Sequence, residues 1–319
     1  MNARALAVPE EDRAWPVYRE VLLAMDRERA EELLAMDGLE PGGLVWNEAV
    51  RFLEENRAVL ATARRAAIMK HLGFVLETGI REEDRGLWPE HYAAQDGADP
   101  FAPLFADSPE TLLVAARMHY VKDLQRLQRL FVIDATLAVE QADGERVTAN
   151  IEALLGMTKQ IRSKDMVIDQ LIARAFAMEA VETAGKVLRD RTELLTDVQL
   201  RRLAHALAAG DLLPAIRLAD ERLWFEDILQ RIYTDDGHGD GHLVPGAFRT
   251  MEIFSIGERA RPDRSAAEIA MTPLANVVVA SRKDMQARYD EMLDHFEALF
   301  ARPYWEMPRN SVAGEELLS

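Results

Sequence analysis

Apolar residues recur at three- and four-residue steps along most of the chain, which is the period of an α-helix that buries one face. The first such stretch covers residues 12–36 and stops at Asp37-Gly38, and the second covers residues 46–76. We expect one helix in each stretch, because neither contains a strong stop signal inside the pattern. In the second stretch Gly73 predicts a kink, since glycine weakens a helix interior.

The middle of the chain begins with a strong helix start at Ser108-Pro109-Glu110. The serine can accept hydrogen bonds from free amides, the proline suits the first helical position, and the glutamate complements the helix dipole. We expect this helix to reach about Gln141, after which Asp143-Gly144 turns the chain. The same apolar period predicts further helices over residues 147–161, 164–188, 194–209, 213–232 and 265–300.

No segment shows the sustained alternation of apolar and polar residues that is typical of a half-buried strand. Val277, Val278 and Val279 form a short β-branched run, but the helical period continues beyond it. The pattern therefore predicts an all-α fold in which antiparallel helical hairpins stack as an irregular tetratricopeptide-like bundle or a short α-solenoid. Similar corners at Gly144 and Gly210 support this, since nearly two tetratricopeptide periods of about 34 residues separate them.

Two interruptions of the helical pattern bear on the domain organisation. We expect residues 1–319 to form a single helical domain, with a sub-boundary near residues 234–246, where glycine, histidine and aspartate accumulate.

The other interruption, over residues 86–108, combines prolines with aromatic residues. Long loops inside a compact domain are usually functional, so this segment is expected either to cover the bundle or to form a lid or groove wall. An apolar pocket there would make residues 88–105 a small-ligand site.

Composition limits the partners and the chemistry. The chain has 55 acidic and 38 basic residues and a formal net charge of −17, so its field repels phosphate backbones and we expect no nucleic-acid partner. It has no cysteine, which excludes disulfides, thiolate metal sites and cysteine nucleophiles. No apolar run reaches the roughly 20 residues of a membrane-spanning helix, so no membrane span is expected and the chain is expected to be soluble as written.

One short segment has the pattern of a metal-binding loop. Asp236, Asp240 and Gly241 occupy the first, fifth and sixth positions of the calcium-loop pattern D-x-[DN]-x-[DN]-G, directly after a predicted helix. The third position is His238 instead of an oxygen ligand, and the twelfth is Ala247 instead of the glutamate that supplies two oxygens. The pattern therefore predicts a degenerate EF-hand-like loop with a weak calcium site.

Two other interpretations of this loop stay open. Asp236, His238, Asp240 and His242 together offer the nitrogen and oxygen ligands that zinc or a similar ion prefers. Alternatively the segment is a metal-free, glycine-rich turn whose aspartates cap neighbouring helices.

Familiar linear motifs of catalysis are missing from the sequence. It contains no H-E-x-x-H, no G-x-x-x-x-G-K-[ST], no G-x-G-x-x-G after a strand and no G-x-S-x-G. We therefore expect a non-enzymatic helical scaffold or interaction module that presents a concave face to a protein or peptide, with the loop as a calcium clip. The alternative is a metal-dependent enzyme that uses the Asp/His loop with an acid from another helix. The oligomeric state is open.

Three segments resemble an uncharacterised family of bacterial, tetratricopeptide-like helical proteins. They are residues 110–188, the phrase LQRIYTDDGHGDGHLVP and the block ASRKDMQARYDEMLDHFEALFARPYWE. Family members commonly show Y-T-D-D-G-x-G-D-G where this chain has residues 233–241, usually with Asn in place of His238. Many relatives look as though a hydrophobic anchor precedes the first helix, which implies a helical body outside the cytoplasm. This sequence has no such anchor, so the compartment stays open, and the resemblance implies no activity.

Overall fold

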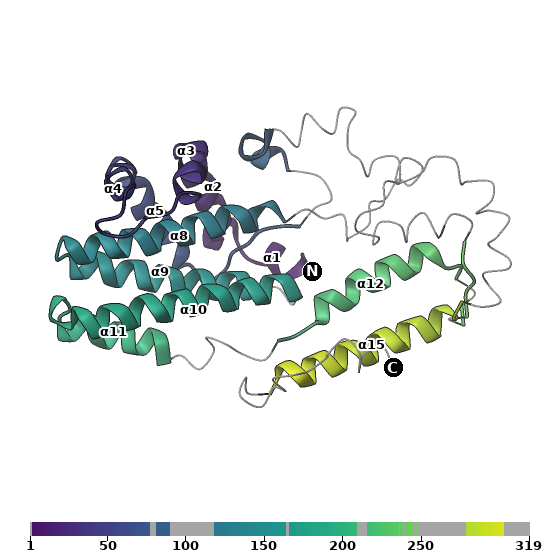
Figure 1. Ribbon diagram of the computed structural model, residues 1–319. Helices are drawn as coiled ribbons and strands as arrows, with labels where there is room; N and C mark the ends of the chain where they lie inside the picture. Colours follow the sequence, from purple (N-terminus) through teal and green to yellow (C-terminus); the bar gives the residue numbers. More distant parts are fainter. Residues whose placement is uncertain are drawn as a thin grey trace. The chain divides into compact units, whose positions relative to one another are not determined.

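The computed structural model describes residues 2–76, 81–89, 118–163, 166–208, 216–235, 237–238, 240–244, 247 and 279–302. All regular elements in these ranges are helices (Figure 1), so the expected all-α fold is confirmed. The chain divides into two compact units, Met1–Pro214 and Ala215–Ser319. The sub-boundary expected near residues 234–246 lies within the second unit, and a single domain over the whole chain stays a prediction.

The first unit contains short helices followed by three long ones. The short elements are α1 (Ala3–Leu6), the 3₁₀ helix η1 (Glu10–Asp12), α2 (Ala14–Ala24), α3 (Arg27–Leu34), α4 (Trp46–Glu55), α5 (Arg57–Ala67) and the 3₁₀ helix η2 (Glu82–Leu87). The remaining elements are α8 (His119–Glu140), α9 (Gly144–Arg162), α10 (Val167–Asp190), the 3₁₀ helix η4 (Thr192–Leu194) and α11 (Asp197–Ala208). The second unit contains α12 (Ala219–Ile232) and α15 (Arg282–Phe300).

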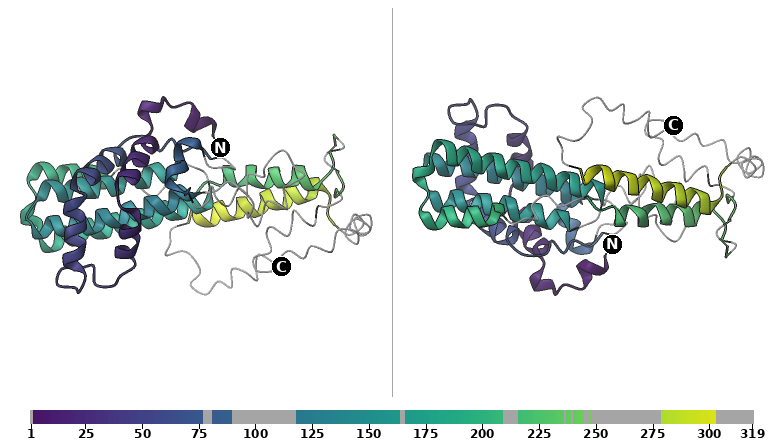
Figure 2. Two further views of the ribbon diagram at one scale, coloured as in Figure 1. Left: turned by 90° about the horizontal axis from the view of Figure 1, so that it is seen from above. Right: turned by 90° about the horizontal axis from the view of Figure 1, so that it is seen from below.

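The long helices α8, α9 and α10 pack side by side (Figures 1 and 2). A tight turn joins α8 to α9, with Ala142 at a positive φ of 53°. The Asp143 side chain then accepts a hydrogen bond of 3.0 Å from the Arg146 amide and so caps α9. The corner predicted at Asp143-Gly144 is therefore confirmed, and it makes α8 and α9 an antiparallel hairpin.

The prediction of one helix over residues 12–36 is wrong. Two helices, α2 and α3, occupy this stretch, and Met25 between them is extended. The Asp26 side chain accepts a hydrogen bond of 3.0 Å from the Arg29 amide and caps α3. The cap starts a new helix inside an unbroken apolar period, because aspartate competes for backbone amides at helix starts.

The prediction of one kinked helix over residues 46–76 is also wrong. The break lies at Asn56, between α4 and α5, where the side-chain amide donates to the Phe52 carbonyl at 2.9 Å. Such local bonds to the backbone offer an alternative to continuing the helix. Beyond α5 the chain is irregular, and Gly73 has a positive φ of 69° with the Arg13 side chain at the position of a would-be Cβ. Gly73 therefore lies within an irregular segment and does not kink a helix.

A charged network lies in the core where α5, α8 and α9 meet. The carboxylate of Asp134 in α8 is fully buried. It accepts hydrogen bonds from Arg64 at 2.8 Å, from Asn150 at 2.7 Å and from two nitrogens of Arg146. Arg64 also donates to the Asn150 side chain at 3.0 Å. One carboxylate thus fastens three helices to one another.

The network extends from Arg146 to Glu54 in α4. Arg146 also donates to Gln141 at 2.9 Å and to Glu54 at 3.4 Å. Hydrogen bonds from Gln141 and from Arg146 lower the pKa of Glu54. Glu54 also pairs with the exposed Arg57 at 3.4 Å. Each carboxylate of the network is therefore paired with guanidinium groups, which is how a buried charge becomes tolerable.

Three further acids bond to aromatic side chains around the start of α8. The indole of Trp15 donates to Asp84 at 3.0 Å, and that of Trp88 donates to Asp123 at 3.0 Å. The Tyr120 hydroxyl donates to Asp169 at 2.5 Å. Burial raises the pKa of Asp84 even though Trp15 and Arg19 both donate to it. These bonds join α2, η2, α8 and α10 at one end of the first unit.

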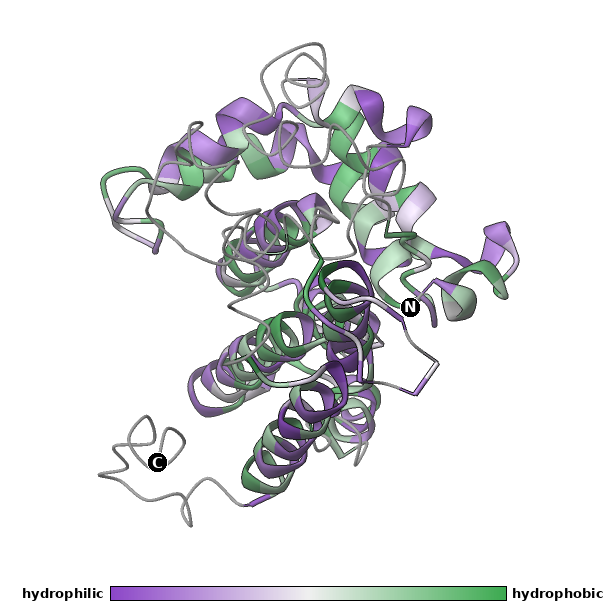
Figure 3. Cartoon of the chain, turned by 90° about the vertical axis from the view of Figure 1, so that its right-hand side faces the viewer, coloured by the Kyte–Doolittle hydropathy of each residue, from purple (hydrophilic) through white to green (hydrophobic). Residues whose placement is uncertain are grey.

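Figure 3 shows hydrophobic and hydrophilic bands on the same helices, which is the two-faced pattern expected from the sequence. In the second unit such faces bring α12 and α15 together, and Phe225 stacks on Tyr289 with ring centroids 3.7 Å apart. Hydrogen bonds join both ends of the pair. The Leu218 amide donates to Glu297 at 2.6 Å, and the Tyr233 hydroxyl donates to the Ala280 carbonyl at 2.9 Å. The two helices are therefore antiparallel.

The substitution Asp134→Asn should lower the free energy of unfolding of the first unit by about 3 kcal/mol or more. It leaves the guanidinium groups of Arg64 and Arg146 buried without their central carboxylate. Urea unfolding followed by circular dichroism measures the loss. As a control, Glu193→Gln removes an exposed ion pair with Arg191 and should leave the transition where it was. Equal transitions for Asp134→Asn and the unmodified protein would contradict this role of the network.

Candidate functional site

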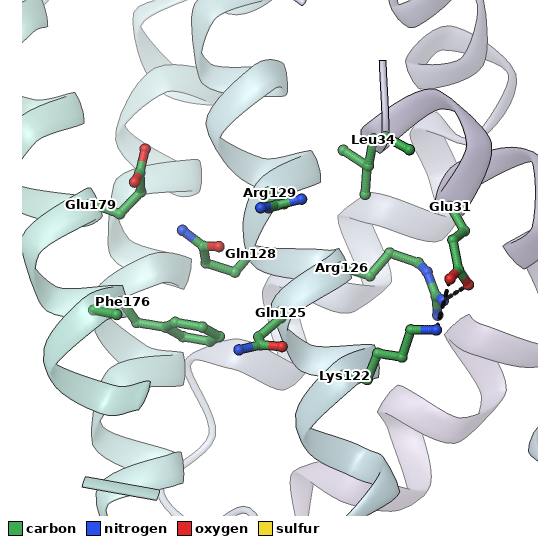
Figure 4. A pocket seen from close by; sticks show the side chains of 11 residues that line it. Glu31, Leu34, Lys122, Gln125, Arg126, Gln128, Arg129, Phe176 and Glu179 are labelled. Atoms are coloured by element: carbon green, nitrogen blue, oxygen red, sulfur yellow. Dashed lines mark hydrogen bonds and ion pairs between the residues drawn. The ribbon is translucent and has the colours of Figure 1, made fainter. Parts of the chain in front are cut away.

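A groove of about 500 Å³ lies on the first unit, with α8 at its floor, α3 on one side and α10 on the other (Figure 4). The residues that line it are Glu31, Leu34, Ala35, Lys122, Gln125, Arg126, Gln128, Arg129, Ala175, Phe176 and Glu179. They come from three helices far apart in the sequence. The apolar period of the sequence does not predict this groove.

Basic side chains dominate the floor of the groove. Lys122, Arg126 and Arg129 follow one another at four- and three-residue steps, so they share one face of α8. Glu31 of α3 accepts from Lys122 at 2.7 Å and from Arg126 at 2.8 Å. Its hydrogen bond with Lys122 lowers the pKa of Glu31. These ion pairs hold α3 against α8.

The positive charge of this face exceeds the negative charge near it. Arg126 also pairs with Asp123, and so does Arg27 of α3. Arg129 is exposed and forms no hydrogen bond or ion pair with the part of the chain that the structure describes. The lining of the groove therefore contains three bases, Lys122, Arg126 and Arg129, and two acids, Glu31 and Glu179. Arg129 is left to interact with a ligand or with water.

Apolar side chains from the two side helices complete the groove. Phe176 of α10 is buried below it, and Leu34 of α3 is half-buried at its edge. Glu179 of α10 faces the basic row from the other side (Figure 4). The groove therefore combines apolar contact area with charged groups that can orient a ligand, which is the composition of many binding surfaces.

A smaller cleft of about 170 Å³ lies further along the same two helices. Its lining includes Thr136 and Val139 of α8, Lys186 and Asp190 of α10, and Pro41 from the loop before α4. Because α8 and α10 are separated by one antiparallel helix, they run in the same direction. The two clefts therefore lie in succession along one seam between α8 and α10.

The predicted metal loop closes on itself through backbone hydrogen bonds. Tyr233 and Leu243 form an antiparallel bridge. The Thr234 amide donates to the His242 carbonyl at 2.7 Å, and the His242 amide donates to the Thr234 hydroxyl at 2.9 Å. A Cβ at Gly241 would lie 1.7 Å from the Thr234 carbonyl oxygen. This close approach requires glycine at Gly241 for the turn alone, with or without a metal.

Those candidate metal ligands of the loop that the structure describes do not come together in one site. His238, Asp240 and His242 are exposed, and Asp236 lies outside the described residues. Within the described ranges no three histidine, aspartate or glutamate side chains form a group that could hold a metal ion. Calcium, zinc and the metal-free turn therefore all stay open as interpretations.

The aromatic segment is described only at its start. Trp88 is buried, donates to Asp123 and lies 5.0 Å from the His119 ring, centroid to centroid. Residues 90–105 lie outside the described residues, so a small-ligand site at 88–105 stays a prediction. The helix start predicted at Ser108 also falls outside the description, and α8 is described from His119.

In the described part of the chain, no helix has both the length and the apolar character needed to cross a membrane.

Comparisons with known proteins identify no relative of this chain. No protein-family model, no curated protein and no solved structure matches the chain. The resemblance to a bacterial helical family therefore stays a prediction, and proposals about function depend on the groove and the loop themselves.

Proposed function

We propose that the protein is a non-enzymatic interaction module that binds an acidic, amphipathic helix or peptide in the groove between α3, α8 and α10. The observation that carries the proposal is the basic row Lys122, Arg126 and Arg129 on the groove floor, with Arg129 exposed and without an ion pair among the described residues. A carboxylate of the partner would pair with Arg129, as guanidinium groups pair well with carboxylates.

The excess of basic side chains in the groove contrasts with the negative net charge of the whole chain. With a formal net charge of −17, the protein repels an acidic ligand at long range. An acidic ligand can therefore bind only at a surface where basic side chains outnumber acidic ones. The groove offers such a place together with apolar contacts at Phe176 and Leu34. Charge pairs would fix the orientation of the partner, and apolar burial would supply most of the affinity.

The shape of the site favours a helical partner. Side chains of neighbouring helices form ridges and grooves into which a further helix packs, and an amphipathic helix in such a groove is a recurring mode of recognition. The stacked hairpins agree with the proposed tetratricopeptide-like character of the fold, in which adjacent helices expose a continuous binding face.

A matched pair of synthetic peptides tests this proposal. Both form amphipathic helices with the same leucine face, and the polar face has glutamate in one and lysine in the other. Fluorescence anisotropy should show binding of the glutamate peptide to the full chain, weakened about fivefold or more by Arg129→Glu. Arg201→Glu, an exposed arginine of α11 outside the groove, is the control and should leave the affinity unchanged. Equal losses in both variants, or no binding of the glutamate peptide, would contradict the proposal.

We propose a separate, structural role for the loop at 234–246 as a weak calcium clip. The supporting observation is that the bonds between Thr234 and His242 hold the loop closed, with the Asp240 carboxylate exposed on it. The described residues alone do not complete a site, so Asp236 and an acid from elsewhere would have to contribute.

Calorimetric titration of the chelator-treated protein with calcium, and then with zinc, tests the clip. Saturable calcium binding should disappear in both Asp236→Ala and Asp240→Ala, because each removes a carboxylate ligand. The alternative of a metal-dependent enzyme gains support only if zinc binds more tightly and binding also requires His238 and His242. If neither ion binds, the loop is a metal-free turn and the clip is wrong.

A further inference from the structure

An apolar stripe runs along the outer face of α10. Its large members, Ile168, Leu171, Met178, Val181 and Leu188, are all exposed, and Met178 is 68% exposed. Two small residues, Ala175 and Gly185, complete the stripe at helical spacing. From Ile168 to Leu188 the stripe rises through twenty residue steps and hence about 30 Å of helix. Exposed apolar residues scattered singly are ordinary, but a continuous row of them marks an interaction surface.

The stripe lies opposite the buried side of α10. The core side of this helix contains Ile172, Phe176, Ala180, Ala184 and Val187, which face the neighbouring helices of the first unit. At about 100° per residue, the stripe falls on the other side of the helix axis. The stripe therefore faces away from α8 and α9, the described helices against which α10 packs.

The spacing of the stripe is symmetric about its centre. From Met178 the next members follow at steps of three, four and three residues towards the N-terminus, and at the same three steps towards the C-terminus. Steps of three and four residues are typical of any apolar helix face, and this order also fits a two-fold axis, which would place each member of the stripe opposite another member. We propose that two copies of this chain associate through antiparallel pairing of their α10 helices, with the two-fold axis at Met178.

The pairing that follows is complementary in size. Met178 meets Met178 of the second copy at the centre. Leu171 lies opposite Gly185, and Val181 lies opposite Ala175, so that a large side chain meets a small one each time. Ile168 and Leu188 close the contact at its two ends. Because the interface is isologous, each of these contacts occurs twice.

Charged residues on the same face select the antiparallel orientation. Arg174 and Glu182 each lie four residues from Met178, on opposite sides of it. Antiparallel pairing places Arg174 of one copy opposite Glu182 of the other, whereas parallel pairing in register would oppose like charges. Arg174 also has an interaction within its own chain, so the contact with the second copy adds to that one. Repulsion in the wrong orientation is a common source of specificity.

The inference does not rest on the proposed function, although the two surfaces meet at Ala175, which also lines the groove. One helix face buries less area than the roughly 800 Å² per partner of a standard stable interface. The association should therefore be weak, with a dissociation constant in the micromolar range.

Sedimentation velocity of the full chain, from about 1 µM to about 200 µM, tests the proposal. The unmodified protein should shift from monomer to dimer over this range. Met178→Glu should weaken dimerisation at least about tenfold, because it places two like charges at the two-fold axis. Val198→Glu is the matched control, since Val198 of α11 is 64% exposed and lies off the stripe, and it should dimerise normally. A monomer at every concentration, or equal loss in both variants, would overturn the proposal.

Two further measurements test the antiparallel orientation and the position of the two-fold axis. Arg174→Glu and Glu182→Arg should each weaken the dimer, and the double substitution should restore it, because the opposite charges meet again. The chain has no cysteine, so Met178→Cys introduces a single thiol, which should cross-link two copies under mild oxidation while Val198→Cys does not. Failure of the double substitution to restore the dimer would exclude the antiparallel orientation, and equal cross-linking at both positions would exclude an axis at Met178.

Discussion

The burial of a single carboxylate, that of Asp134, constrains the rest of the first unit. A charge out of contact with water is tolerated only when hydrogen bonds and opposite charges surround it. Arg64 and Arg146 supply both, and they come from the helices on either side of α8. The rotation of α8 about its own axis is thereby fixed. Because that rotation is fixed, Lys122, Arg126 and Arg129 line the groove.

The helix α10 has three distinct faces. One face packs in the core, a second faces the groove beside α8, and the third presents the apolar stripe centred on Met178. A protein that binds a partner along one face of a helix and a second copy along another would bring two partners together. Both surfaces belong to the first unit, whereas the glycine-rich loop belongs to the second.

The apolar period was sufficient to predict the all-α fold and the corner at Asp143-Gly144, because both follow from local spacing and capping. It did not predict the breaks at Met25 and Asn56, since side-chain bonds to the backbone interrupt helices there without disturbing the period. The groove could not be predicted, because three helices distant in sequence form it. The row of bases on α8 was a signal that could have been noticed. At the loop, the spacing of aspartates and glycines predicted a metal site. The Thr234 carbonyl oxygen lies so close to Gly241 that the turn requires a glycine there in any case, so this glycine does not itself indicate a metal.

The central claim is that the groove formed by α3, α8 and α10 is the binding surface. Photo-crosslinking tests it most directly, with a benzophenone amino acid placed at Gln125, which is exposed on the groove floor, or at Val198, which is exposed on α11. In the presence of the glutamate-faced helical peptide, a cross-link should form from position 125 and not from position 198. Cross-links from position 198 alone, or from both positions equally, would contradict the account.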